Sequence, residues 1–447
     1  MPIRIVTIAM FFFLAGCGDR VARPQLSADA TESPGGATAA AATVRSTTEP
    51  SVDWPWWRGP NRNGVANGPA PPVRWSATEN VVWKVSVPGR GHGVPTVVGD
   101  RVYLPTADDD HQIQSVLAFD RKTGDVVWHK DVNKGGFPAQ IHPHNSHATP
   151  TIAVVGDRIF AVFYHHDSIQ VTALDHDGNQ LWQESAGSYR PEKHRFGYAP
   201  SPSIYLGTVI ISAEADTGSY LVALDGETGA ERWRTPRPQN NTFSSPTVGQ
   251  VAGQHLLLIS GHDRITAYDP ATGRSLWFCP ATTRATCGTL VWDGDLVFGS
   301  GGYPKAETVC VRVQGDSGTV VWSNQTKCYE QSLVAHNGYL YAVNDGGIAY
   351  CWRTADGEEM WKERLPGGPV SASPVLAGNR IYMSNERGTT YVFSTNPDAF
   401  KLLGTNQLGD DAFSTPSISG GRIYLRVGKT EGDQRREYLY CIGEQDS

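Results

Sequence analysis

A short phrase that ends in tryptophan recurs six times along this chain of 447 residues. Every copy carries a glycine four residues before its tryptophan, and a further tryptophan, Trp83, lies one interval upstream. Successive tryptophans stand 39 to 54 residues apart. Self-similarity at this period is typical of propellers and other repeat proteins, so the chain is predicted to be an array of one structural unit. The copies occupy residues 117–128, 172–182, 222–233, 266–277, 311–322 and 349–361.

Each copy predicts a β-hairpin. An apolar strand leads into a polar turn, where an aspartate such as Asp120 can accept hydrogen bonds from the turn amides. The glycine supplies the positive φ that a tight turn needs. The tryptophan then begins the outgoing strand, where its ring can cover the seam between neighbouring units, so we interpret it as structural. The six glycines are Gly124, Gly178, Gly229, Gly273, Gly318 and Gly357.

A second phrase, found eight times, completes the repeat unit. Each copy reads as a strand, a turn containing glycine and a second strand, with apolar and polar residues alternating. Together the two phrases predict four strands per unit and eight units, which is an all-β, eight-bladed β-propeller of four-stranded antiparallel blades. The copies span residues 94–105, 149–163, 201–212, 245–259, 288–300, 332–343, 373–384 and 415–426.

The ends of the array predict how the ring closes. The eighth unit supplies three strands, the third over 438–442, whereas the strand predicted at 80–87 has no partners of its own. Pairing 80–87 outside 438–442 completes the eighth blade and removes an open strand edge. We therefore assign residues 80–447 to one closed propeller. The seventh unit is expected to be degenerate, because Leu402 and Leu403 stand where a tryptophan is expected.

The N-terminal segments predict export and a membrane tether. Residues 1–16 resemble a secretory signal peptide, with one basic residue, an apolar run and then small residues. The sequence LAGC at 14–17 resembles a bacterial lipobox, which implies cleavage before Cys17 and lipid attachment to it. Residues 17–52 are rich in Ala, Thr, Ser, Pro and Gly, and predict a disordered tether. Gly18 favours the outer membrane facing the periplasm, since an aspartate there retains enteric lipoproteins in the inner membrane.

A tryptophan-rich segment separates the tether from the propeller. It spans residues 53–79 and contains Trp54, Trp56 and Trp57 within DWPWWRGPNRNG. Three large rings so close together are expected to pack against the ring of blades, so we predict a strap or plug across it.

Composition limits the partners and the redox chemistry. A formal net charge of −7 argues against nucleic acid as a partner. Six cysteines remain besides Cys17, and one or two disulfides are expected among them, without assigned pairing. Cys351 and Cys441 occupy a small inward position held by alanine in other units and predict buried thiols. The six are Cys279, Cys287, Cys310, Cys328, Cys351 and Cys441.

The pattern A-x-D-x-x-T-G-x-x-x-W, seen best at 117–128, 222–233 and 266–277, resembles the PQQ-type repeat of eight-bladed propellers. Two branches share this repeat: quinoprotein dehydrogenases, which bind pyrroloquinoline quinone (PQQ) and calcium over the ring centre, and the BamB-type lipoprotein scaffold of the β-barrel assembly machinery. The segment at 53–64 also resembles the W-x-x-x-RGP-x-x-x-G opening of secreted bacterial PQQ-repeat proteins.

The dehydrogenase branch is disfavoured by what the sequence lacks. Its alcohol-oxidising members use two adjacent cysteines, a calcium site of Glu, Asn and Asp, and an aspartate base, but this chain has no Cys-Cys pair. Its aspartates are accounted for by hairpin turns, and we find no nucleophile and base pattern. No cofactor is therefore expected, and PQQ with calcium is expected only under the alternative of a PQQ-dependent oxidoreductase.

The loops before the innermost strands are predicted to line one mouth of the central channel, where propellers bind ligands. Three histidines of HPHNSH, at 142, 144 and 147, are weaker candidates for a metal site, since no cysteine or carboxylate stands at ligand spacing. The candidate binding residues are His92, His144, His147, Tyr198, Asn241, Arg284, Glu330 and Asp411, and the metal candidates are His142, His144 and His147.

These observations predict a non-enzymatic, lipid-anchored scaffold outside the cytoplasm. We expect its partners to be envelope proteins or peptides, including β-barrel assembly components, bound at strand edges and rim loops. We expect a monomer that touches the membrane through its lipid only. The alternatives are the PQQ-dependent oxidoreductase and a carbohydrate-binding or small-ligand-binding propeller that uses the channel mouth and Trp54–Trp57.

Overall fold

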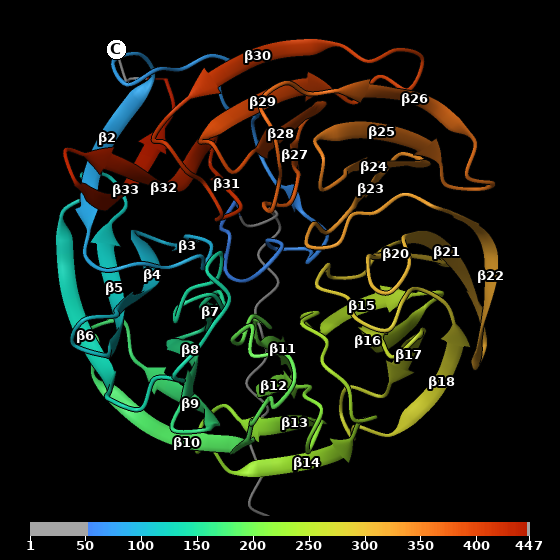
Figure 1. Cartoon of the computed structure of the whole chain (residues 1–447), viewed down its shortest axis with the longest axis horizontal. Helices are drawn as coiled ribbons and strands as arrows, with labels where there is room; N and C mark the ends of the chain where they lie inside the picture. The colour runs from blue at the N-terminus through green and yellow to red at the C-terminus, as the bar shows by residue number, and fades with distance from the viewer. Residues whose placement is uncertain (1–51, 445–447) are drawn as a thin grey trace, which may run out of the picture. The chain divides into compact units, whose positions relative to one another are not determined.

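The computed structural model describes residues 52–444 (Figure 1). The predicted signal peptide, Cys17 and the tether up to residue 51 lie outside the described residues. The described part contains strands and turns and no helix, so it offers no helix long and apolar enough to cross a bilayer.

Eight sheets stand around a common hub, which confirms the predicted eight-bladed propeller (Figure 1). In blades 1 to 7 the four strands run from the hub outward in sequence order. Blade 1 has β3 (Thr96–Val98), β4 (Arg101–Asp108), β5 (Ile113–Asp120) and β6 (Val126–Lys134); blade 2 has β7 (Ala153–Val155), β8 (Arg158–His165), β9 (Ser168–Leu174) and β10 (Gln180–Ser188); blade 3 has β11 (Ser203–Tyr205), β12 (Thr208–Ala213), β13 (Tyr220–Asp225) and β14 (Glu231–Pro236); blade 4 has β15 (Thr247–Val251), β16 (Gln254–Gly261), β17 (Arg264–Tyr268) and β18 (Ser275–Pro280).

The remaining blades follow the same plan. Blade 7 gains a fifth strand at the hub, because β1 (Val65–Ala66) pairs in parallel with β27. Blade 5 has β19 (Val291–Asp293), β20 (Leu296–Gly301), β21 (Glu307–Gln314) and β22 (Ser317–Asn324); blade 6 has β23 (Val334–His336), β24 (Tyr339–Val343), β25 (Ile348–Arg353) and β26 (Glu359–Arg364); blade 7 has β27 (Val375–Ala377), β28 (Arg380–Ser384), β29 (Thr389–Ser394) and β30 (Leu402–Gln407); blade 8 has β31 (Ser417–Ser419), β32 (Arg422–Glu431), β33 (Gln434–Ile442) and β2 (Val81–Val87).

The ring closes as predicted, with an N-terminal strand outside a C-terminal one. Strand β2 runs antiparallel to β33, and Trp83 faces Cys441 in the register. A buried guanidinium joins this blade to the first: Arg426 is paired with Glu437 and donates to the Pro105 carbonyl oxygen at 2.6 Å. The strand pair and the ion pair therefore complete blade 8 itself, and the buried guanidinium of Arg426 joins blade 8 to blade 1.

Tryptophans cover the seams between blades, as predicted. Six indole N–H groups donate to a backbone carbonyl of the next blade. Five of these rings lie over the hairpin glycine of that blade, whereas the ring of Trp361 contacts Phe400. A Cβ added at Gly178, for example, would lie 2.8 Å from the ring of Trp128. The six bonds are Trp83 to Arg121, Trp128 to His176, Trp182 to Gly226, Trp233 to Pro270, Trp322 to Thr354 and Trp361 to Asn396.

Blade 5 departs from the predicted hairpin. Its turn contains only two residues, and the positive φ falls on Gly315, so the prediction of a positive φ at Gly318 is wrong. Gly318 instead leaves room for the ring of Trp277, whose atoms would lie 2.8 Å from an added Cβ. Because this short turn presents no carbonyl to the ring, the indole N–H of Trp277 has no partner within the described residues.

The seventh blade has no seam tryptophan of its own, and the strap supplies one. Trp75 is buried and stacks on Tyr382 of β28, with ring centroids 6.4 Å apart. Tyr103 of β4 and Tyr424 of β32 occupy the equivalent register and contact the tryptophans of their own blades. The degenerate blade is thus completed from a distant part of the sequence.

The six described cysteines are free thiols, so the expectation of one or two disulfides is wrong. Three of them sit on the third strand of separate blades, each facing the seam tryptophan, where other blades carry alanine: Cys310, Cys351 and Cys441. Burial raises the pKa of Cys351 to about 12, as expected for a buried thiol.

Candidate functional site

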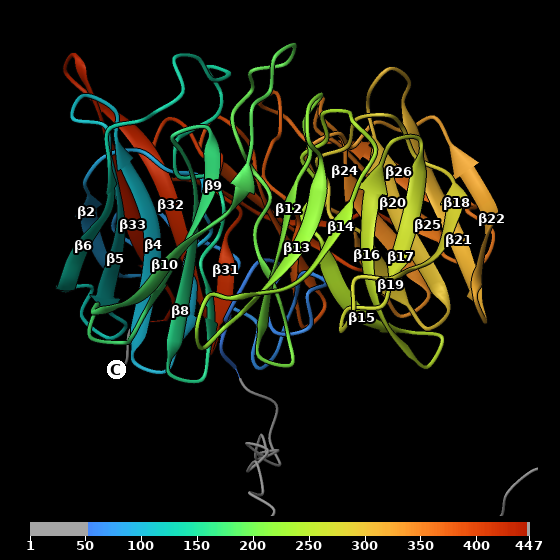
Figure 2. The same ribbon diagram turned by 90° about the horizontal axis from the view of Figure 1, so that it is seen from below.

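The strap closes one end of the central channel. Residues 52–64 run across the hub and make hydrogen bonds with seven of the eight blades, mostly to backbone groups (Figure 2). Trp54 forms a two-bond bridge with Val97 of β3, and Arg62 donates to the Ile204 carbonyl oxygen at 2.7 Å. The predicted strap therefore lies across the ring, and it blocks this side of the channel.

Arg58 anchors the strap between blades 6 and 7. Its side chain is 1% exposed and donates to the carbonyl oxygens of Leu333 at 2.7 Å and Pro374 at 2.9 Å. Burial lowers the pKa of Arg58 to about 9, so the group stays cationic at neutral pH. Gly64 is required beside it, because an added Cβ would overlap the guanidinium.

Above the strap lies a cavity of about 320 Å³, lined by residues of all eight blades with Trp57 at its floor. Two tiers of side chains form its wall, one from each of two positions in the repeat. We call the tier nearer the strap the belt and the next tier the upper ring. The belt residues are Val94, Thr151, Ser201, Ser245, Thr289, Ser332, Ser373 and Thr415.

The belt joins the blades with a chain of hydrogen bonds. At six of the eight junctions, the backbone N–H of a belt residue donates to the hydroxyl oxygen of the belt residue in the next blade, at 2.9–3.1 Å. This series of hydrogen bonds is interrupted at Val94, which has no hydroxyl, and at Thr289, whose hydroxyl accepts the indole N–H of Trp57 at 2.7 Å. The strap thus replaces one bond of the belt.

The upper ring stands two residues before the belt in every blade. Side chains two residues apart on an extended chain point the same way, so this position also faces the channel. All eight residues line the cavity, and they differ chemically where the belt is almost uniform. They are His92, Thr149, Ala199, Phe243, Cys287, Glu330, Ser371 and Phe413.

The upper ring has aromatic and polar sides. Phe413 of blade 8 stacks on His92, with centroids 4.9 Å apart, and Phe243 of blade 4 contacts Phe196 at 6.0 Å. Blades 4 and 8 face one another across an eight-membered ring, so these phenyl groups stand on opposite walls. Burial raises the pKa of Glu330, on blade 6, which favours its neutral form.

The open mouth of the cavity is formed by loops of blades 2 and 3. His142 and His144 are exposed there, with ring centroids 5.4 Å apart, and Phe196 lies beside His142. A neighbouring hollow of about 350 Å³ opens between the two loops and includes Lys193 and Arg195. The hollow beside the mouth therefore carries cationic groups, whereas the residues that line the central cavity include neither Lys nor Arg.

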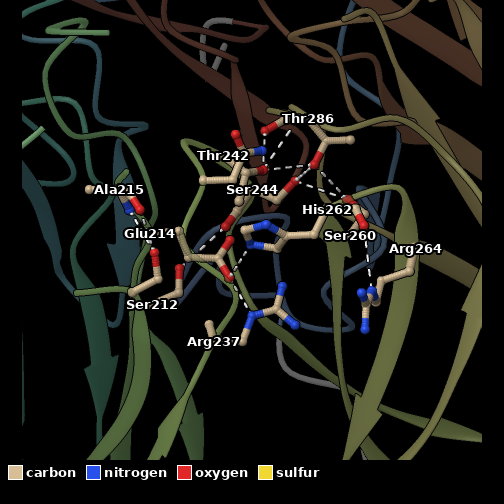
Figure 3. Close-up of polar contacts among 12 residues, drawn as sticks. Ser212, Glu214, Ala215, Arg237, Thr242, Ser244, Ser260, His262, Arg264 and Thr286 are labelled. Carbon is tan, nitrogen blue, oxygen red and sulfur yellow. Dashed lines mark hydrogen bonds and ion pairs between the residues drawn. The ribbon is translucent and has the colours of Figure 1, made fainter. Parts of the chain in front are cut away.

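A buried polar network joins blades 3 and 4 next to the cavity-lining residue Phe243 in the sequence (Figure 3). Glu214 of blade 3 is paired with Arg237 and accepts from His262 at 3.3 Å, and all three side chains are almost fully buried. Burial alone would raise the pKa of Glu214, but these two neighbours outweigh it and hold the pKa below its usual value. The hydroxyl of Ser244, beside Phe243, bonds to Ser260 and to the next blade.

Three of the eight predicted binding residues line the cavity: His92, His144 and Glu330. The other five are placed elsewhere and contact protein groups. The hydroxyl of Tyr198 donates to Ser212, the amide of Asn241 donates to His194, His147 packs on Phe137, Arg284 pairs with Asp263, and Asp411 pairs with Arg435.

The metal candidates do not form one cluster. His142 and His144 are neighbours, but Nδ1 of His142 already accepts the backbone N–H of His144 at 3.2 Å. His147 lies against Phe137 instead. Residues 52–444 contain no group of three or more His, Cys, Asp or Glu side chains arranged to hold a metal ion.

The lining residues that sequence reasoning missed include five members of the upper ring and the mouth residue Phe196. The five are Thr149, Ala199, Phe243, Cys287 and Phe413. A signal for the upper ring exists in the repeat itself. A Ser or Thr stands two residues before the innermost strand in seven blades, and Val94 takes this place in blade 1. Once this position is recognised as the belt, the position two residues earlier predicts the cavity wall in all eight blades.

A family model described as "Outer membrane protein assembly factor BamB" matches residues 64–216, 193–349 and 305–398. The chain belongs to this family. The overlapping matches span about three quarters of the chain, and they confirm the resemblance to PQQ-repeat and BamB-type propellers.

Similar proteins include an outer membrane protein assembly factor and dehydrogenases. The outer membrane protein assembly factor BamB of Bordetella pertussis is 23% identical, over 77% of this chain and 84% of its own. A polyvinylalcohol dehydrogenase of a Pseudomonas species is 21% identical, over 78% of this chain and 68% of its own. The crystal structure of a quinohemoprotein alcohol dehydrogenase from Comamonas testosteroni superposes with a TM-score of 0.60 at 13% identity, over 89% of this chain and 81% of that one.

The cavity residues do not fit the quinone and calcium of the dehydrogenase branch. The lining contains one carboxylate, Glu330, and one cysteine, Cys287, and these stand on different blades. Calcium prefers six to eight oxygen ligands with several carboxylates, and PQQ itself carries carboxylates that need cationic partners. The side chains that line this cavity supply neither set.

Proposed function

We propose that the chain is a non-enzymatic scaffold in the assembly of outer-membrane proteins. The observation that carries this is the family match over residues 64–398, together with a relative of that name aligned over most of both chains. A scaffold needs binding surfaces and no reacting groups.

The place proposed for this activity is the periplasmic face of the outer membrane. LAGC at 14–17 supports lipid attachment to Cys17, and the segment up to residue 52 has the composition of a flexible tether. Such an anchor would hold a monomeric propeller near the membrane. No nucleic-acid partner is proposed, given the formal net charge of −7.

The proposed partner surface is the outer wall of the ring. Each outermost strand pairs on one side only, so its other edge offers backbone groups to an added strand. Several outer strands also expose apolar side chains, against which the side chains of an added peptide would pack. They are Val126 and Val127 of β6, Leu181 of β10, Phe278 of β18, Val320 of β22 and Leu402 of β30.

The test is made in the native host. Deletion of the coding sequence should lower the amount of β-barrel proteins in the outer membrane, and the full chain should restore it. Photo-crosslinkers placed at Val126, Phe278 or Val320 should capture a β-barrel assembly component. Unchanged barrel levels, with no assembly component crosslinked from any of the positions, would refute the scaffold.

The anchor is tested separately with Cys17→Ser. This variant should lose labelling by fatty acid and leave the membrane fraction, while its propeller remains folded. Labelling that survives the substitution would refute lipid attachment at Cys17.

A further inference from the structure

The cavity above the strap is a built site that the scaffold role does not require. Its floor, wall and mouth come from different elements: Trp57 of the strap, two tiers of eight positions, and the loops of blades 2 and 3. A volume of about 320 Å³ falls at the lower end of the range of ligand pockets, roughly 300–1,000 Å³. A ligand of one or two rings would fill it.

The belt presents hydrogen-bond donors to such a ligand. Five belt hydroxyls line the cavity, and each accepts a backbone amide, so the hydroxyl proton remains available to an acceptor in the cavity. Hydroxyls can donate and accept, which suits a partner that also does both. The five are Thr151, Ser201, Ser245, Ser373 and Thr415.

The charge of the site indicates a neutral ligand. No Lys or Arg lines the central cavity, and its one carboxyl, Glu330, is pushed toward its neutral form by burial. The buried imidazole of His92 has a pKa well below its usual value, because of burial and nearby arginines, and its Nε2 has no protein partner. A phosphate or polycarboxylate would have no cation here to offset its loss of water.

The arrangement of the upper ring indicates the shape of the ligand. Phe243 and Phe413 stand on opposite walls, and polar groups from blades 2 and 6, Thr149 and Glu330, occupy the walls between them. A molecule with two apolar faces and a hydroxylated edge matches this pattern. The C–H faces of a sugar ring carry partial positive charge and are attracted to the negative face of a phenyl ring.

We propose that the hub cavity binds a neutral sugar, as a mono- or disaccharide, with its faces toward Phe243 and Phe413 and its hydroxyl edge toward Glu330, Thr149 and the belt. The site is reached through the mouth formed by His142, His144 and Phe196. This binding activity is independent of the scaffold function, since the cavity lies at the hub and the proposed partner surface lies on the outer wall.

The test uses the full chain in a detergent without a sugar headgroup. Glucose, galactose, mannose, N-acetylglucosamine, maltose and cellobiose are titrated separately, with binding followed by calorimetry and by saturation transfer from protein to sugar protons. At least one sugar should bind with a Kd below about 10 mM. Failure of all six to bind in this range would overturn the proposal, as would preferential binding of PQQ that excludes sugar.

Two matched pairs of variants locate the site. Ala199→Trp fills the cavity and should abolish binding, whereas Ala271→Trp places the same ring on an exposed turn between β17 and β18 and should leave it unchanged. Phe413→Leu removes one aromatic wall at similar volume and should weaken binding at least tenfold. Phe278→Leu, on the exposed outer strand β18, is its control. Sugar binding that survives both cavity variants would overturn the assignment, and Phe413→Leu keeps the test valid if Ala199→Trp fails to fold.

Discussion

At the scale of single residues, a seam between blades depends on a large aromatic ring on one blade and on the lack of a side chain on the next. At six seams the ring of the tryptophan lies against a glycine of the next blade, where no side chain stands in its way. Gly178 does this for Trp128 and also adopts a φ of +82°, so two separate constraints fall on one position. The repeat phrase therefore has a glycine here both because it lacks a Cβ and because it can adopt a positive φ. Gly318 separates the two reasons, since it makes room for the ring of Trp277 but does not have a positive φ.

These two constraints can be separated by a pair of alanine substitutions. Gly178→Ala and Gly156→Ala both place a Cβ at positive φ, which costs about 1–2 kcal/mol. The Cβ at Gly156 meets no atom within 4 Å, whereas that at Gly178 would overlap the ring of Trp128. Urea and thermal unfolding should therefore show Gly178→Ala to be less stable than Gly156→Ala by roughly 1–3 kcal/mol. Equal losses would mean that the ring moves aside freely.

At the scale of elements, the blade was the most predictable part of the molecule. Strand number, hairpin turns and the closing pair of β2 with β33 followed from a pattern repeated eight times, because each copy confirms the others. Contacts between unlike elements were not predictable. Glu214 meets Arg237 and His262 at separations of 23 and 48 residues, and none of these lies in the repeated phrase.

Blade 7 shows how such a contact can complete an element. The strap residue Trp75 takes the place of its missing seam tryptophan by stacking on Tyr382. Trp75→Ala should lower the stability of the protein by about 3–5 kcal/mol, the usual cost of emptying a large buried ring site. In hydrogen exchange, β28 and β29 should lose protection, while blade 3, which keeps its own Trp182 and Trp233 seams, should not. A uniform loss over all blades would contradict this local role.

The buried network between blades 3 and 4 predicts a pH dependence. Because the pKa of Glu214 is lowered in the folded state, its ionised form contributes stability above its usual value near 4.5, and that contribution is lost as the pH falls through the lowered value. Glu214→Gln should cost about 3–5 kcal/mol at pH 7, since it leaves Arg237 buried without a counter-charge. Its melting temperature should then fall less steeply than that of the natural chain between about pH 5 and pH 3, a range that begins above the usual glutamate pKa and extends below it.

The control for this variant is Asp356→Asn. Asp356 also pairs with an arginine, Arg353, but on an exposed turn where ion pairs contribute little. Its stability at pH 7 and its pH profile should stay close to those of the natural chain. A profile for Glu214→Gln as steep as that of the natural chain would show that other carboxylates dominate the acid sensitivity.

At the scale of the whole molecule, the strap closes one end of the ring, so that the central channel becomes a cavity with one open mouth. The sequence predicted a plug from three clustered tryptophans, yet its tasks differ residue by residue: Trp54 is buried against blade 1, Trp57 floors the cavity, and Arg58 bridges blades 6 and 7. Which ring faces the cavity depends on the path of the chain across the hub, and no local pattern records that path. The same reason explains why five of eight predicted mouth residues do not line the cavity, since their loops fold onto neighbouring groups instead.

Because one guanidinium joins the strap to two blades, it should matter to the entire ring. Arg58→Met keeps much of the apolar stem but leaves the carbonyls of Leu333 and Pro374 without their donor, which should cost roughly 2–4 kcal/mol. The matched control is Arg74→Met, the same change at an exposed position of the same segment. Differential scanning calorimetry should show a lower melting temperature for Arg58→Met only. Hydrogen exchange should show the innermost strands β23 and β27 opening before the outer strands. If both variants melt alike, the strap is a covering that the ring does not need, and the cavity floor must be held by Trp57 and its bond to Thr289 instead.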